Sequence, residues 1–124
     1  MRGRAVLLLC LAPAAQACEL PGGPAEKLQS AAHTILYRVE PALEVGKHFA
    51  LELAVCPPPG DLRVDAWMPA HRHGMNYRPS LRPLGEGRYR AEGLMFHMPG
   101  RWEFLFEVRG AGKTERFAHG LQLK

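Results

Sequence analysis

The sequence lacks a hydrophobic segment long enough to span a membrane. Its longest apolar run, residues 5–15, contains Pro13 and is about half of the roughly 20 residues that a spanning helix needs. Two arginines precede the run, and the small-x-small pattern AQA of residues 15–17 ends it, as in a secretory signal. We therefore expect residues 1–17 to be a signal peptide, and the protein to be periplasmic or secreted with no membrane span after signal removal.

The chain also lacks a basic patch and a recognisable catalytic motif. Without residues 1–17 it would carry 14 Lys and Arg against 12 Asp and Glu, a net charge of +2. Its arginines are scattered, mostly beside glutamates, so nucleic acid is not an expected partner. No nucleophile motif occurs, and no loop holds paired carboxylates for acid–base work. These absences predict that the protein is not an enzyme.

Cysteine is scarce, with three residues in the whole chain. Signal cleavage would remove Cys10 and leave Cys18 and Cys56. An even pair in an exported protein favours a disulfide. The alternative is a lipoprotein signal that would make Cys18 a lipid anchor, although position 15 is Ala instead of the usual Leu of such signals. Both readings remain open from the sequence.

After residue 33, apolar residues alternate with polar ones at a period of two, which is typical of strands. Strands are expected at about residues 34–39, 47–56, 61–68, 76–82, 87–96, 101–109 and 113–123. Turn sequences rich in Pro and Gly, such as CPPPGD and RGAGK, separate them.

Seven short strands in one small unit predict an all-β fold, an immunoglobulin-like antiparallel β-sandwich. The expected organisation is a signal peptide at residues 1–17, an N-terminal segment at 18–32 and the sandwich at 33–124.

Methionine and histidine are unevenly distributed. Four of the five methionines and three of the six histidines lie in two windows, residues 68–75 and 95–98. The first window, MPAHRHGM, places His71, His73 and Met75 two residues apart. In an extended backbone all three side chains would project to one side.

The second window contributes His97 and Met98, which precede a Pro-Gly pair typical of a type II turn. We expect this turn to be the tip of a hairpin. If every strand simply reverses the direction of the one before it, the two windows lie at the same end of the sandwich. Strand parity thus predicts that residues far apart in sequence meet there.

The combined side chains predict a copper site formed by His71, His73, Met75, His97 and Met98. Imidazole suits copper and zinc, whereas the soft thioether sulfur selects Cu(I). Copper is therefore the expected ion, with Cu(I) favoured and Cu(II) as a second form. A zinc site of His71, His73 and His97 is the second choice, because of the neighbouring methionines.

The other histidines and methionines need no metal. His33, His48 and His119 are scattered and are expected to be structural or exposed. For Met68 and Met95, core packing competes equally with a ligand role.

The two tryptophans are assigned in the same way. Trp102 is expected to anchor the core. Trp67, out of phase with the inward side of its strand, is either a cation–π cover for bound Cu(I) or a buried residue of the second sheet face.

The segments VDAWMPAHRHGMNYRPSL and GRYRAEGLMFHMPGRWEFLFEV resemble the YtkA-like domain, which also occurs in FixH-like proteins. The resemblance covers about residues 45–123. It rests on the His/Met/Gly loop, on the G-x-Y strand at residues 87–89 and on the Met-Pro-Gly-x-Trp segment at 98–102. It implies an exported or tethered immunoglobulin-like sandwich, and copper binding or delivery connected with the maturation of respiratory oxidases. The transmembrane helix of FixH-like proteins has no counterpart here.

Two functional hypotheses follow. The first is a periplasmic metallochaperone or buffer that captures copper and passes it to a copper-receiving envelope protein or a respiratory oxidase. The second is an immunoglobulin-like interaction module that contacts another envelope protein without any metal.

Overall fold

The computed structural model describes residues 8–11 and 17–124. Most of the predicted signal peptide therefore lies outside the described residues. The described part of the chain contains no helix that is long and apolar enough to cross a membrane. Its strands are β1 (Glu26–Gln29), β2 (Thr34–Glu40), β3 (His48–Cys56), β4 (Asp61–Met68), β5 (His73–Gly74), β6 (Ser80–Gly85), β7 (Arg88–Met95), β8 (Gly100–Gly110) and β9 (Lys113–Leu123).

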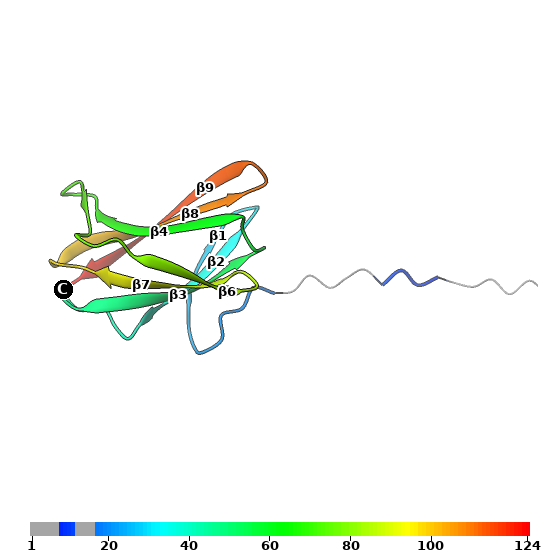
Figure 1. The fold of residues 1–124 in the computed structure, drawn as a ribbon, viewed down its shortest axis with the longest axis horizontal. Coiled ribbons are helices and arrows are strands. Elements are labelled where there is room, and N and C mark those ends of the chain that lie inside the picture. The colour runs from blue at the N-terminus through cyan, green and yellow to red at the C-terminus, as the bar shows by residue number, and fades with distance from the viewer. Residues whose placement is uncertain (1–7, 12–16) are drawn as a thin grey trace, which may run out of the picture.

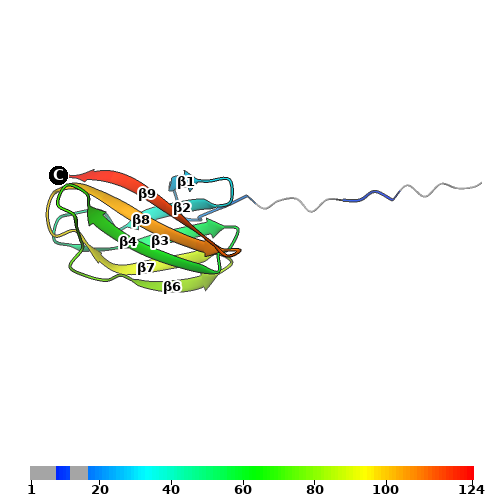
Figure 2. The ribbon, with the colours of Figure 1, turned by 90° about the horizontal axis from the view of Figure 1, so that it is seen from above.

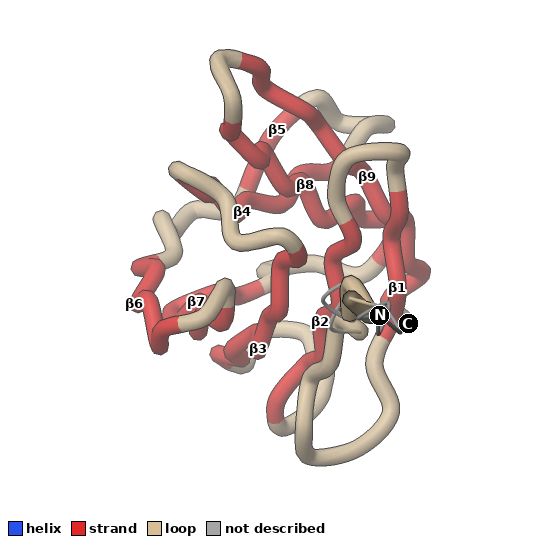
Figure 3. Tube along the Cα trace, turned by 90° about the vertical axis from the view of Figure 1, so that its right-hand side faces the viewer, coloured by secondary structure: helices blue, strands red, loops and turns tan. Residues whose placement is uncertain are grey.

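The strands form two antiparallel sheets packed face to face (Figures 1 and 2). The five-stranded sheet has the order β1-β2-β3-β7-β6, and the four-stranded sheet has the order β5-β4-β8-β9. The end-on view of Figure 3 shows the two layers with loops closing the space between them. The predicted all-β sandwich is confirmed.

The core lies between the sheets and follows directly from the period-two alternation. Along β8, Trp102, Phe104, Phe106 and Val108 are each fully buried, while the residues between them face outward. The other sheet contributes apolar residues of β3 to the same cluster: Phe49, Leu51, Leu53 and Val55. Burial of a large apolar side chain stabilises the fold by about 1.5–3 kcal/mol. The alternation thus decides which face of each strand is inside.

The strand predictions fail in two places. The strand expected at residues 76–82 begins only at Ser80, because residues 75–79 carry the chain from one sheet to the other. Two strands were not predicted. The two residues of β5 are too few for a periodic signal, and β1 belongs to the segment 18–32, which pairs with β2 as part of the sandwich.

The expected hairpin tip at residues 97–100 is also wrong. β7 pairs with β3 and β6, whereas β8 pairs with β4 and β9, so this link crosses between the sheets. Each crossing still reverses the chain direction. The parity argument therefore survives although the hairpin does not.

The two ends of the sandwich are closed differently. At one end, on the left in Figure 1, β4 and β7 end and β3 and β8 begin. We call this end the histidine pole, because the segments that contain His71, His73 and His97 connect the strands there. At the disulfide pole, on the right, β3 ends at Cys56, which is bonded to Cys18 with a Cα–Cα distance of 5.6 Å. The predicted disulfide is confirmed.

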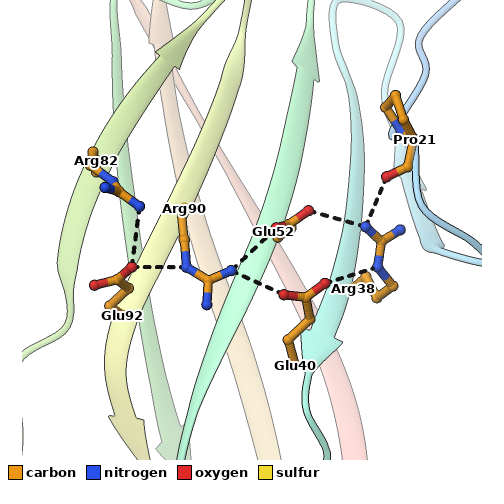
Figure 4. A network of polar contacts seen from close by, with 7 residues as sticks. All are labelled: Pro21, Arg38, Glu40, Glu52, Arg82, Arg90 and Glu92. Carbon is orange, nitrogen blue, oxygen red and sulfur yellow. Dashed lines mark hydrogen bonds and ion pairs between the residues drawn. The ribbon is translucent and has the colours of Figure 1, made fainter.

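A line of alternating charges crosses the outer face of the five-stranded sheet (Figure 4). Its ion pairs join Arg82, Glu92, Arg90, Glu52, Glu40 and Arg38. Two of these pairings, those with Arg90 and Arg38, hold the pKa of Glu40 below its ordinary value. At the end of the line, the Arg38 guanidinium donates to the carbonyl oxygens of Pro21 at 2.9 Å and Gly23 at 3.3 Å. The network therefore fastens the N-terminal segment to the sheet.

Candidate metal centre

Three imidazoles from two distant segments lie at the histidine pole, with the ring of His73 next to that of His71 and next to that of His97. The ring centroids of His71 and His73 are 5.6 Å apart, and those of His73 and His97 are 5.3 Å apart. Strand parity had placed the two windows at one end, and the structure brings these three rings together. We call them the imidazole trio.

The first two rings owe their positions to a tight return after β4. The His71 amide donates to the Met68 carbonyl at 3.2 Å, and Arg72 adopts a positive φ of 53°. The chain then pairs back on itself as β5, with His73 opposite Met68. The extended backbone expected for the whole window is therefore wrong at His71, which lies in the turn. The reversal itself keeps the two rings close.

His73 has one ring nitrogen fixed by the backbone. Its Nδ1 lies 3.0 Å from the carbonyl oxygen of Gly74. A carbonyl only accepts, so Nδ1 carries the proton and Nε2 of a neutral ring keeps its lone pair. Metal-bound histidines commonly make this same contact with their other nitrogen, because it orients the ring.

His97 contains a buried polar atom without a partner. Its Nδ1 is shielded from solvent and accepts or donates no hydrogen bond within residues 8–11 and 17–124. A buried unpaired polar group costs about 1–3 kcal/mol. An ion or a proton donor at this atom would recover that cost. The sequence predicted His97 as a metal ligand, but it could not show that its Nδ1 is buried without a hydrogen-bond partner.

Trp102 lies beneath the trio, which sequence reasoning did not predict. Its ring is 5.5 Å from His97 and 6.1 Å from His73, each in an edge-on arrangement. Its indole N–H donates to the carbonyl of Met98 at 3.0 Å and so holds the crossing link in place. The prediction of a core anchor is correct, since the side chain is fully buried. The same residue also supports the site.

Trp67 has a different neighbour. Its indole N–H donates to Glu103 at 3.1 Å, while its flanking residues Ala66 and Met68 are buried in the core. Trp67 therefore lies on the outer face of the four-stranded sheet, where it pairs with a carboxylate. Among the described aromatic pairs, none joins it to the trio.

The methionines divide into core and boundary positions. Met68 is 2% exposed and belongs to the core. Met75 and Met98 are half-buried and pack against the core at the pole that holds the trio. Met95 is half-buried at the end of β7. The two predicted thioether ligands, Met75 and Met98, thus lie at the histidine pole, where the core meets the solvent.

The spacing of two ring pairs, His71 with His73 and His73 with His97, is compatible with an ion bound between the rings of each pair. Two imidazoles on a tetrahedral ion, with bonds of about 2.0–2.1 Å, have ring centroids roughly 5 Å apart. The observed separations of 5.6 and 5.3 Å are close to this. In the described ranges, however, no group of three or more His, Cys, Asp or Glu side chains is arranged to hold a metal ion. Binding by all three rings therefore requires side-chain rotation.

Two histidines outside the trio are occupied by protein partners. His33 Nδ1 lies 2.5 Å from a carboxylate oxygen of Glu115. His119 Nδ1 is hydrogen-bonded to the hydroxyl of Tyr37, whose pKa is raised by burial and by the charge of Glu26. Their structural assignment from sequence agrees with these contacts. His48, the last of the six, lies edge-on to Tyr77 with a centroid distance of 5.2 Å.

Comparison with known proteins finds one family model that matches the central part of the chain. Residues 57–106 match the family model described as YtkA-like. The matched segment includes the trio, both boundary methionines and Trp102. No curated protein and no solved structure matches the chain.

Proposed function

We propose that the chain, which contains a YtkA-like domain, is an exported copper-binding protein that captures Cu(I) and Cu(II) and passes the ion on or buffers it. The observation that carries the proposal is the meeting of His71, His73 and His97 from two separate segments. Copper is the cargo of the site in this proposal.

The donor types favour copper over other ions. Three imidazoles with thioethers at their margin suit a soft or borderline cation, and methionine sulfur selects Cu(I). A calcium or magnesium site would need several carboxylates. Among the described ion pairs, none brings a carboxylate to a trio imidazole.

The graded exposure of the trio suits transfer. His71 is exposed, His73 and His97 are half-buried, and the Nδ1 atom of His97 is shielded from solvent. An incoming ion would first meet His71 and would exchange ligands stepwise towards His97. Release to a copper-receiving envelope protein or a respiratory oxidase would follow the reverse order. The disulfide is compatible with an oxidising, exported setting.

Titration with Cu(I) against a chromophoric chelator tests the proposal. We expect one equivalent to bind the wild-type protein, and affinity to fall at least 100-fold in the triple variant His71→Ala, His73→Ala, Met75→Ala. Replacement of His97 alone should weaken binding about tenfold. His33→Ala is the matched control, because it removes a histidine at the other pole. Equal binding by the triple variant and the wild type would overturn the proposal.

A thermal melt separates this function from the metal-free interaction module. A ligand that binds only the folded state at 100 times its dissociation constant adds about 2.7 kcal/mol of stability. Copper should therefore raise the melting temperature of the wild type by several degrees and leave the triple variant unchanged. An unchanged wild-type melt would favour the interaction module.

A further inference from the structure

A second group of metal-binding side-chain types lies at the histidine pole, on the outer face of the five-stranded sheet. His48 at the start of β3 is the Cα partner of Met95 at the end of β7. The next pair along, Phe49 with Leu94, is buried in the core. Because strand side chains alternate between faces, His48 and Met95 share the outer face. Directly opposed residues have Cβ atoms about 4.5–5.5 Å apart.

The environment of His48 leaves its ring available. His48 is exposed, and no hydrogen bond or ion pair engages its ring nitrogens within the described part of the chain. Its ring is edge-on to Tyr77, which is 46% exposed. A cation held here would meet an imidazole nitrogen, a thioether sulfur and a nearby aromatic ring, three groups that attract a soft cation.

The pair is joined to the trio by short stretches of chain. Met95 lies two residues before His97, which is about 7 Å in extended backbone. Tyr77 lies four residues after His73. The segment that carries His97 therefore also carries Met95, a member of the pair. The segment that carries His73 also carries Tyr77, whose ring contacts His48. The pair and the trio are thus connected through the same two short segments of chain at one pole.

We propose that His48 and Met95 form a second, weaker Cu(I) site that loads or unloads the imidazole trio. This inference rests on the proposed function for its biological meaning, but the pair binds through its own residues. No electron transfer is involved, since Cu(I) moves between neutral ligands without a change of oxidation state.

Titration of the mature full-length chain with Cu(I) under reducing, anaerobic conditions tests the second site. Imidazole and methionine-methyl signals are followed separately by proton–carbon NMR. The first equivalent should shift the signals of the trio, and the second should shift those of His48 and Met95. In His48→Ala or Met95→Leu, the second step should weaken at least tenfold while the first is unchanged. Met68→Leu, which removes a buried sulfur at the same pole, should retain both steps.

The triple variant His71→Ala, His73→Ala, His97→Ala separates the two proposals. If the first step is lost and the signals of His48 and Met95 still shift, the second site is supported by itself. If the wild type shows trio shifts alone, the second site is overturned and the proposed function stands. A second step that persists unchanged in both His48→Ala and Met95→Leu also overturns it. The absence of every shift would overturn both.

Discussion

Both poles of the sandwich contain histidine, but the histidine rings differ in their hydrogen-bond partners. At the disulfide pole, His33 is paired with Glu115, and the nearby Ser30 hydroxyl accepts hydrogen bonds from the backbone N–H groups of Ala32 and His33. At the histidine pole, the ring of His71 makes no hydrogen bond or ion pair within the described residues, and the buried Nδ1 of His97 makes none either. The described contacts therefore engage the ring of His33 with a carboxylate, whereas at the histidine pole only the ring of His73 has a hydrogen-bond partner, the Gly74 carbonyl.

The two poles also differ in how they are closed. The disulfide pole is crosslinked by Cys18 and Cys56, whereas loop packing over Trp102 closes the histidine pole. β3 connects the two, from His48 to Cys56. Eight residue steps along a strand are roughly 26 Å. Perturbation of one pole should therefore leave the other nearly unchanged, because contacts at that separation act almost independently.

Removal of the disulfide should produce the largest change. In the chain-entropy estimate, a crosslink over 38 residues stabilises the folded state by about 4 kcal/mol. The variant Cys18→Ala, Cys56→Ala should lose about this amount in urea unfolding, and its Cu(I) affinity below the melting temperature should match the wild type. A reductant should destabilise the wild type and not the variant. A parallel loss of copper affinity would show that the poles are coupled.

Two glycines, one at each pole, should give the next largest effects. Gly87 has a φ of 75°, and an added Cβ would lie 2.3 Å from the Val55 carbonyl oxygen. Gly100 has a φ of 130°, and its Cβ would meet only the movable methyl end of Met68 at 2.8 Å. We expect Gly87→Ala to cost about 3 kcal/mol or more and Gly100→Ala about 2 kcal/mol.

Thermal and urea unfolding measure both glycine variants. Gly112→Ala is the control, because its φ is 74° but no atom lies within 4 Å of the added Cβ. It should cost about 1 kcal/mol. Equal losses in all three would mean that backbone conformation alone decides the cost. In that case the rigid backbone contact at the disulfide pole would be irrelevant.

Replacement of Arg38 should have a moderate effect confined to the side of the N-terminal segment. Its guanidinium holds the carbonyls of Pro21 and Gly23 and pairs with Glu52 at 3.1 Å, and its side chain is 16% exposed. Arg38→Ala should cost about 1–2 kcal/mol and accelerate amide exchange in residues 19–25. Arg82→Ala, at the 65% exposed end of the same network, should cost less than about 0.5 kcal/mol. Equal exchange in the two variants would contradict the fastening role.

The smallest effect concerns pH at the disulfide pole. Hydrogen bonds from Ser30 and His33 hold the pKa of Glu115 below its ordinary value of 4.5. A carboxyl whose pKa is lowered on folding contributes stability above its unfolded pKa, and loses it as pH falls through the folded value. Glu115→Gln should therefore be less stable than the wild type at pH 7, with the difference shrinking as pH falls below about 4.5. A difference that grows on acidification would contradict this sign.

Much of the fold and part of the site could be predicted from local pattern. Alternation placed Trp102, Phe104 and Phe106 inside, because successive strand side chains point to opposite faces. Parity of strand direction placed His97 at the same end as His71 and His73. That argument needed only the number of reversals, so it tolerated the wrong assignment of residues 97–100 as a hairpin tip.

Other features depended on contacts that no local pattern contains. The partners His33 and Glu115 are 82 residues apart, as are Tyr37 and His119. The role of Trp102 under the imidazoles was missed for the same reason, since its burial was evident but its neighbours were not.

The sequence by itself determined the alternating strands, the turn positions and the two windows in which histidine and methionine gather, because these follow from residue order and backbone stereochemistry. The tertiary structure decided which sheet each strand joined and which histidines found protein partners. It also left the Nδ1 of His97 buried without a partner among the described residues. These outcomes depend on packing between strands that are distant in sequence, where hydrogen-bond geometry and burial are set by the whole assembly.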